Sequence, residues 1–149
     1  MDTTKKYCDM CYKAKELQKE HKWNYGDWLI AEHAIFMIGD ACFYYDTSDK
    51  PPKQSELPEA SIQSEERSQF IGELIWLPRI DQFVYMIRAV EMESDLKIAQ
   101  DFGKWTGAFL KKQQFALFFS MEQLWLSYVM EKLYNRRWTY NEWREIDEG

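Results

Sequence analysis

The sequence predicts an α+β fold in which about four helices pack on a small antiparallel sheet of three to four strands. Two observations support this class. Apolar residues recur at helical spacing in four long segments, and short aromatic or β-branched runs lie between turn residues, as antiparallel strands do. The chain has 149 residues, 46% of them apolar and 30% charged, which suffices for one domain with its own core. We therefore expect a single domain over 1–149.

The first helix is expected over residues 4–20. Its apolar side chains recur at the i, i+3, i+4, i+7 spacing of one helical face, with lysines and glutamates elsewhere. These side chains are Tyr7, Met10, Cys11, Ala14 and Leu17. The helix should stop within 21–25, because Gly26–Asp27 then predicts a turn.

Two or three short strands should follow this turn. Trp28–Ala31 and Ala34–Ile38 have strand composition, and Ala41–Tyr45 can pair with the second run across a two-residue hairpin at Gly39–Asp40. Phe70–Leu77 returns to an apolar run and is the last expected strand.

A polar segment, 46–68, separates these strands. It contains three prolines and only two large aliphatic side chains, which cannot bury enough surface to order it, so we expect a long mobile loop. A connection of this length is either functional or a tolerated insertion, and we favour an insertion.

The second half of the chain predicts three more helices. Pro78 suits the first turn of one of them, where its missing N–H is not needed. The buried stripe of this helix should contain Ile80, Phe83, Val84 and Ile87.

Ser94 can cap the next long helix. This helix carries Leu96, Ala99, Phe102, Thr106 and Phe109. Gly103 and Gly107 weaken it by about 1 kcal/mol each relative to alanine, and they can instead allow a neighbour to pack closely.

The last helix has the clearest local signature. Ser120 and Gln123 form a capping box, in which the hydroxyl accepts one orphan amide while the glutamine can reach back to another. The following residues are apolar nearly all round the helix, which places it at the centre of the core. They are Leu124, Trp125, Leu126, Tyr128, Val129, Met130 and Leu133. After Asn135 the tail should fold back over the body.

The composition excludes several classes of protein. Glycine, proline and cysteine are too rare for a collagen-like or disulfide-rich chain. The 25 acidic and 19 basic residues give a formal charge of −6 without a basic block, which argues against affinity gained by neutralising many phosphates. The start does not resemble a secretory signal, three cysteines suit a reducing compartment, and polar residues interrupt the apolar segment 115–130. We therefore expect a cytosolic protein without a membrane span.

The C-x-x-C motif Cys8–Cys11 is the first candidate site. Two thiolates can bind zinc or form a redox pair, but a structural zinc site needs four ligands. Cys42, His21 and His33 are the only other cysteine and histidines. A thioredoxin-like motif would follow a strand, whereas this one lies early in an amphipathic helix. We expect packed cysteines with no metal and no cofactor, and metal or redox chemistry is the alternative.

Glu32–His33 is the second candidate site. With Asp27 and Asp40 nearby, the histidine could be a general base with an orienting carboxylate. No nucleophile motif accompanies it, so a turn or strand-surface histidine is the favoured interpretation. A hydrolase or nucleotide-processing enzyme with an unrecognised site stays an alternative, and no catalytic residue is assigned.

The seven Trp, nine Tyr and nine Phe could serve a core, an interface or a base-stacking platform. Such platforms normally lie in a positive groove, and only Arg136, Arg137 and Arg144 come near to one, so nucleic acid binding ranks third. Trp138 and Trp143 would lie about 140° apart on a helix. One should therefore pack inward and the other outward, as an interface anchor beside these arginines.

Three segments together carry a resemblance. They are Trp23-Asn24-Tyr25-Gly26-Asp27-Trp28, Ile75-Trp76-Leu77-Pro78-Arg79-Ile80-Asp81-Gln82, and Ser120-Met121-Glu122-Gln123-Leu124-Trp125-Leu126-Ser127-Tyr128-Val129-Met130 with Trp138 and Trp143. Over residues 8–30 and 70–143 the chain resembles small uncharacterised proteins encoded by bacteriophages and prophages of Gram-positive bacteria, and the insertion at 46–68 departs from their pattern. The resemblance implies a phage gene product with helices sandwiched on a small antiparallel sheet. It transfers no catalytic residue.

The expected function is therefore that of a phage or prophage accessory protein in the host cytoplasm. It should act by binding a host or phage protein, or a second copy of itself. An aromatic-rich acidic body without a recognisable catalytic constellation favours this interpretation over the enzyme and nucleic-acid alternatives.

Overall fold

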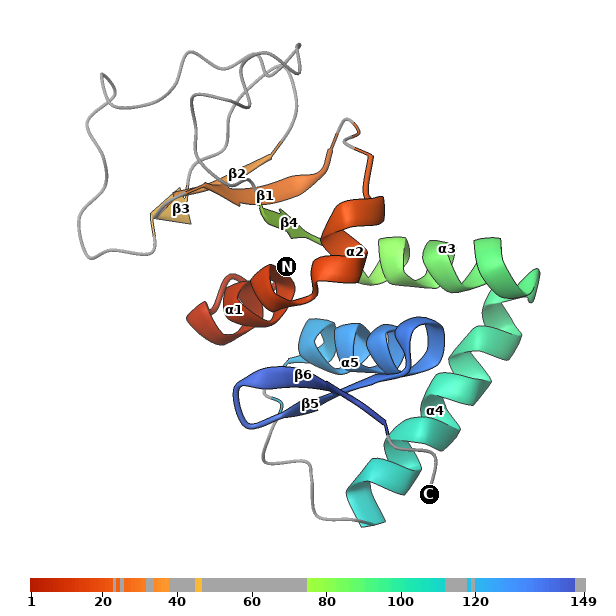
Figure 1. Cartoon of the computed structure of the whole chain (residues 1–149). Coiled ribbons are helices and arrows are strands. Elements are labelled where there is room, and N and C mark those ends of the chain that lie inside the picture. Colours follow the sequence, from red (N-terminus) through yellow and green to blue (C-terminus); the bar gives the residue numbers. More distant parts are fainter. Residues whose placement is uncertain are drawn as a thin grey trace. The chain divides into compact units, whose positions relative to one another are not determined.

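The chain divides into two compact units (Figure 1). The computed structural model describes residues 1–22, 24, 26–31, 34–37, 45–46, 75–111, 118 and 120–146. The N-terminal unit is Thr3–Leu77, and the C-terminal unit contains Met1–Asp2 and Pro78–Gly149. Whether the two units form the one expected domain stays a prediction. Residues 47–68 of the expected loop lie outside the described residues, and so does the expected hairpin turn at Gly39–Asp40.

The N-terminal unit combines two short helices with a four-stranded antiparallel sheet. Its elements are α1 (Lys5–Lys13), α2 (Lys15–Glu20), β1 (Trp28–Ala31), β2 (Ala34–Met37), β3 (Tyr45–Asp46) and β4 (Ile75–Leu77). The strand order is β3-β2-β1-β4, and α1 packs against β4. Together with the helices of the C-terminal unit, this confirms the α+β class.

Strand β1 pairs antiparallel with β2 on one side and with β4 on the other. Trp28 lies opposite Met37 of β2 on one side and Leu77 of β4 on the other, and Ala31 pairs with Ala34 at the far end of β1. The expected strands at 28–31 and 34–38 are thus confirmed within one residue. The last expected strand is confirmed for its final three residues, and its first five lie outside the described part of the chain.

The expected helix over 4–20 is broken in two at Ala14. This residue leaves the helical conformation (φ −79°, ψ 66°), and its N–H donates to the carbonyls of Met10 and Cys11, both at 3.1 Å. The predicted apolar stripe is nevertheless buried in both helices. Hydrophobic spacing does not reveal the break, because both pieces keep their apolar residues on the buried side.

The C-terminal unit is built around one helix. Its elements are α3 (Ile80–Glu91), α4 (Asp95–Lys111), α5 (Met121–Tyr134), β5 (Arg136–Thr139) and β6 (Glu142–Glu145). Helix α5 contacts α3, α4 and β5, and every residue from Gln123 to Met130 is buried, as its all-round apolar sequence predicts. In the described part of the chain, no helix is both long enough and apolar enough to cross a membrane.

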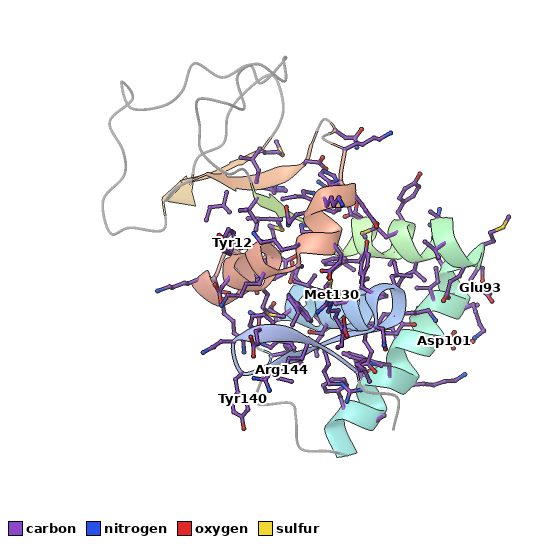
Figure 2. The ribbon with its side chains drawn as sticks, in the orientation of Figure 1. Tyr12, Glu93, Asp101, Met130, Tyr140 and Arg144 are labelled. Atoms are coloured by element: carbon purple, nitrogen blue, oxygen red, sulfur yellow. The ribbon has the colours of Figure 1, made fainter. Side chains whose placement is uncertain are left out.

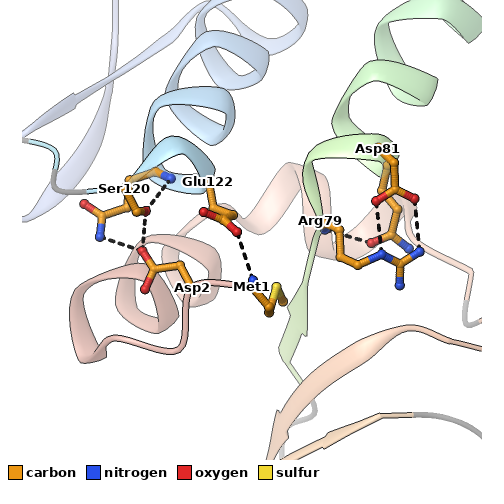
Figure 3. Close-up of polar contacts among 8 residues, drawn as sticks. Met1, Asp2, Arg79, Asp81, Ser120 and Glu122 are labelled. Carbon is orange, nitrogen blue, oxygen red and sulfur yellow. Dashed lines mark hydrogen bonds and ion pairs between the residues drawn. The ribbon is translucent and has the colours of Figure 1, made fainter.

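The N-terminus of α5 is held by polar contacts within the C-terminal unit (Figure 3). The Ser120 hydroxyl accepts the backbone N–H of Gln123 at 3.2 Å, which confirms the predicted cap. The Gln123 side chain is directed elsewhere, because its amide donates to the carboxylate of Asp2 at 2.8 Å, and the Ser120 hydroxyl also donates to this carboxylate. A buried carboxylate is favoured there by the positive end of the helix dipole.

Helix α3 begins at Ile80, with Arg79 as its N-cap (Figure 3). The expectation that Pro78 lies in the first turn is therefore wrong, because Pro78 precedes the N-cap. The Gln82 side-chain oxygen accepts the Arg79 backbone N–H at 2.9 Å. Asp81 accepts two hydrogen bonds from the Arg79 guanidinium, and this interaction holds the pKa of Asp81 below its ordinary value. These contacts at the helix start join residues within three positions of one another.

Helix α4 is capped by Ser94 as predicted, since the hydroxyl accepts the Lys97 N–H at 3.3 Å. Phe102 and Phe109 are buried, but Leu96 is exposed. The expectation of close packing at the two glycines is wrong, because a Cβ built at Gly103 or Gly107 meets no described atom within 4 Å.

Replacing these glycines with alanine should therefore stabilise the protein. Gly103→Ala and Gly107→Ala should each raise the free energy of unfolding by about 0.5 to 1 kcal/mol, because alanine restricts the unfolded chain and meets open space in the folded one. Urea denaturation measures the effect, with the double variant testing additivity. A loss of stability in either single variant would show that a neighbour does approach the helix.

Candidate functional site

The predicted interface residues lie on the β5–β6 hairpin, and the expectation that one tryptophan faces outward is wrong. Trp138 and Trp143 are directly opposite each other across the two strands, and both are buried. Their rings meet edge to face, with centroids 4.9 Å apart. Residues that face each other in a hairpin point to the same side of it, whereas the 140° separation assumed a helix.

The arginines beside this pair have acidic partners within the same unit. Arg137 makes two hydrogen bonds to Glu131 at 3.1 and 3.2 Å, and Arg136 lies 3.4 Å from Glu145. The Arg144 guanidinium donates to Glu142 at 2.7 Å. The Arg136–Glu145 pair joins the two strands, the Arg137–Glu131 pair joins β5 to α5, and the Arg144–Glu142 pair lies within β6. Each arginine therefore has a carboxylate beside it, and the three do not form a cationic surface by themselves. The interface role predicted for Trp138, Trp143, Arg136 and Arg137 stays a prediction.

The two cysteines of the C-x-x-C motif lie on α1 and are buried, as the packing interpretation predicts. The Cys8 thiol contacts the backbone carbonyl of Thr3 at 4.0 Å, and Cys11 belongs to the stripe that is fully buried. No group of three histidine, cysteine or acidic side chains that could hold a metal is present in the described ranges. Cys42 and His33 lie outside these ranges.

A histidine–carboxylate pair does occur, but not at the predicted histidine. Glu32, His33 and Asp40 lie outside the described residues, whereas Asp27 contacts His21, with Nε2 and Oδ2 2.8 Å apart. The same oxygen of Asp27 accepts the backbone N–H of Asn24 at 2.7 Å. A histidine directly after a helix and an aspartate directly before a strand are the signal that could have indicated this pair.

His21 also stacks on Trp76 of the edge strand β4. The ring centroids are 3.5 Å apart and the planes differ by 8°. Gln18 continues the contact, because its side-chain oxygen accepts the Trp76 N–H at 2.8 Å while its amide donates to the Trp76 carbonyl at 2.9 Å. A glutamine amide therefore pairs with the outer edge of β4 as the peptide group of another strand would, which protects this edge from pairing with other chains.

Substituting Gln18 tests this pairing. Gln18→Glu keeps an acceptor for the Trp76 N–H but removes the donor that serves the carbonyls of Trp76 and Cys11, the latter at 3.1 Å. We expect a loss of about 1 to 3 kcal/mol in the free energy of unfolding, because buried carbonyls are left unpaired beside a new negative charge. An unchanged denaturation midpoint would mean that water replaces the amide.

Burial lowers the pKa of His21, and the hydrogen bond and charge of Asp27 oppose this shift only in part. His21 is therefore neutral at pH 7, and its Nε2 donates the proton to the carboxylate, since an ionised carboxylate only accepts. An imidazole oriented by a carboxylate can transfer protons in hydrolases. Here 9% of the His21 side chain and 1% of Asp27 are exposed, so the pair offers little surface to a substrate and holds the 21–27 connection onto the sheet.

The His21 pKa predicts how stability depends on pH. As the pH falls below 6.5, the ordinary value, unfolded chains gain a proton on His21 that the folded protein still excludes. Stability should fall until the pH passes the lowered pKa of the folded state, and then level off. His21→Gln keeps a donor for Asp27 but does not titrate, so the stability difference between wild type and this variant should shrink from about pH 7.5 to about pH 5.5. Urea denaturation at both values measures it, and a difference that grows on acidification would contradict the direction of the shift.

Four of the large apolar side chains that are exposed in the described part of the chain come from α3, from the start of α4 and from the connection between them. At this α3–α4 junction they are Tyr85, Val90, Met92 and Leu96. Met92 ends α3 with its N–H donating to the Arg88 carbonyl at 2.8 Å, and the Arg88 side chain pairs with Asp95 of α4 at 2.8 Å. These contacts fix the junction, which Figure 2 shows around the labelled Glu93. Exposed large apolar side chains on an ordered surface are typical of protein-binding sites.

Comparison with protein families, with characterised proteins and with solved structures finds no match to this chain. The exposure of Tyr85, Val90, Met92 and Leu96 makes the α3–α4 junction the candidate functional site.

Proposed function

We propose that this chain is a bacteriophage or prophage accessory protein that acts in the host cytoplasm by binding another protein through its α3–α4 junction. The observation that carries the proposal is the exposure of four large apolar side chains between residues 85 and 96. Leaving them in water loses hydrophobic stabilisation, which a partner surface would restore on binding. The sequence resemblance supports the phage origin, and the partner belongs to the host or to the phage.

Met92 is the most exposed of these side chains, at 92%. Methionine is flexible and polarizable, and it adapts to partner surfaces of different shape. The hydrogen bonds and the ion pair of the junction hold its backbone in place, so little ordering of the main chain opposes binding.

The test is affinity capture of the tagged protein from phage-infected host cells, followed by mass spectrometry. Wild type should retain a partner that Met92→Gly and Leu96→Ser both lose, because these changes remove apolar surface without touching the buried core. Light scattering on the same variants checks whether the partner is a second copy of the chain.

Tyr140→Ser is the matched control. Tyr140, like Met92 and Leu96, is a large exposed side chain, at 84%. Figure 2 shows it on the opposite side of the C-terminal unit from Glu93. The control variant should keep the partner. Retention of every captured protein by both junction variants would contradict the proposed function.

A further inference from the structure

Helix α3 is apolar on two faces. Phe83 and Ile87 are fully buried on the side that packs against α5. Tyr85, Ala89 and Met92 follow one another at i, i+4 and i+7, which places them in one line along the opposite side. Tyr85 is 65% exposed and Ala89 is also exposed. A helix with one buried and one uncovered apolar stripe has the pattern of a helix that receives a second helix from outside.

The backbone conformation of Met92 holds its side chain outside the fold. Its φ of 55° lies in the left-handed region, and the helix C-terminal position that it occupies favours glycine or asparagine. A glycine there would relieve the backbone and would expose no apolar surface. The Met92 side chain is thus held almost fully in water at a backbone position that carries a cost in stability.

The charges at the end of the stripe indicate the complementary charge of the partner. Asp95 is paired with Arg88, and Glu91 lies 3.0 Å from Lys132. Glu93 is exposed, and its charge acts on Lys97 of α4 without a direct ion pair in the described part of the chain. The chain as a whole carries a formal charge of −6. A basic partner is thus favoured both at the contact and during its approach.

From this placement we infer that the outer face of α3 docks an amphipathic helix of the partner protein. The apolar stripe of that helix packs along Tyr85, Ala89 and Met92, and a lysine or arginine at its edge pairs with Glu93. The stripe from Tyr85 to Met92 covers about two helical turns, or about 10 Å, which matches two apolar layers of a docked helix. This inference rests on the proposed function and specifies the partner.

Two synthetic helical peptides of about 18 residues provide the test. Both carry the same leucine stripe, flanked by lysines in one and by glutamates in the other, and their affinity for the full chain is measured by fluorescence anisotropy. The lysine-flanked peptide should bind at least about tenfold more tightly. Tyr85→Ser and Met92→Gly should each weaken its binding about tenfold, and Tyr140→Ser should not change it. Met92→Gly should also raise the thermal midpoint, because glycine relieves the left-handed backbone.

Three results would overturn the inference: equal affinities of the two peptides, no binding of either, or binding that survives both stripe variants. Binding that survives both stripe variants would show a non-specific attraction between a cationic peptide and an acidic protein. Failure of the proposed function looks different, because captured partners would then be retained by Met92→Gly. If capture depends on Met92 but the peptides are not distinguished, the protein-binding role stands and the basic helix is wrong.

Discussion

Replacing Trp143 with alanine should lower the free energy of unfolding by about 3 to 5 kcal/mol. Its side chain is 8% exposed and meets Trp138 edge to face across the hairpin, while β5 packs against α5. Truncation removes a large buried aromatic surface and the partner of an aromatic pair. Chemical denaturation followed by circular dichroism measures the loss.

Tyr140→Ala is the control on the same hairpin. Tyr140 is exposed at the β5–β6 turn, so its truncation should change stability by no more than about 0.5 kcal/mol. If Trp143→Ala is as stable as this control, Trp143 is not part of the core. The prediction that a tryptophan of this hairpin serves as an interface anchor would then be favoured.

Truncating Leu124 should cost about 2 to 5 kcal/mol, more than removing the helix cap beside it. Leu124 is buried on α5, where alanine would leave a cavity. Ser120→Ala should cost about 0.5 to 2 kcal/mol, because the Gln123 N–H loses its acceptor.

The comparison of the stability losses in Leu124→Ala and Ser120→Ala tests whether core burial outweighs the helix cap. Denaturant midpoints of the two single variants give it directly, since both changes lie at the same end of one helix. A greater loss for Ser120→Ala would mean that the contacts between Ser120 and Asp2 contribute more than the burial of α5. Asp2→Asn would then reproduce most of the serine effect.

The sequence by itself located the helices of the C-terminal unit and the strands β1, β2 and β4. The Ser94 and Ser120 caps and the all-round apolar run of α5 are local patterns, and each involves residues within a few positions of one another. The buried stripe of α1 and α2 follows from spacing alone. Such features depend on short-range hydrogen bonding and periodicity, so no knowledge of the rest of the chain is needed to predict them.

Tertiary structure decided the features that join distant residues. Gln18 bonds to Trp76, 58 positions away, and His21 stacks on the same side chain. No local pattern indicates these partners, because any polar side chain near a helix end could bond to water instead. The hairpin of Trp138 and Trp143 was missed for a related reason: its turn has Tyr140 with a φ of 56°, where turn chemistry favours glycine, so the usual sequence signal is absent. Which face of α3 is buried depends on its packing against α5. Apolar residues in a sequence do not by themselves indicate which of two helix faces will be covered.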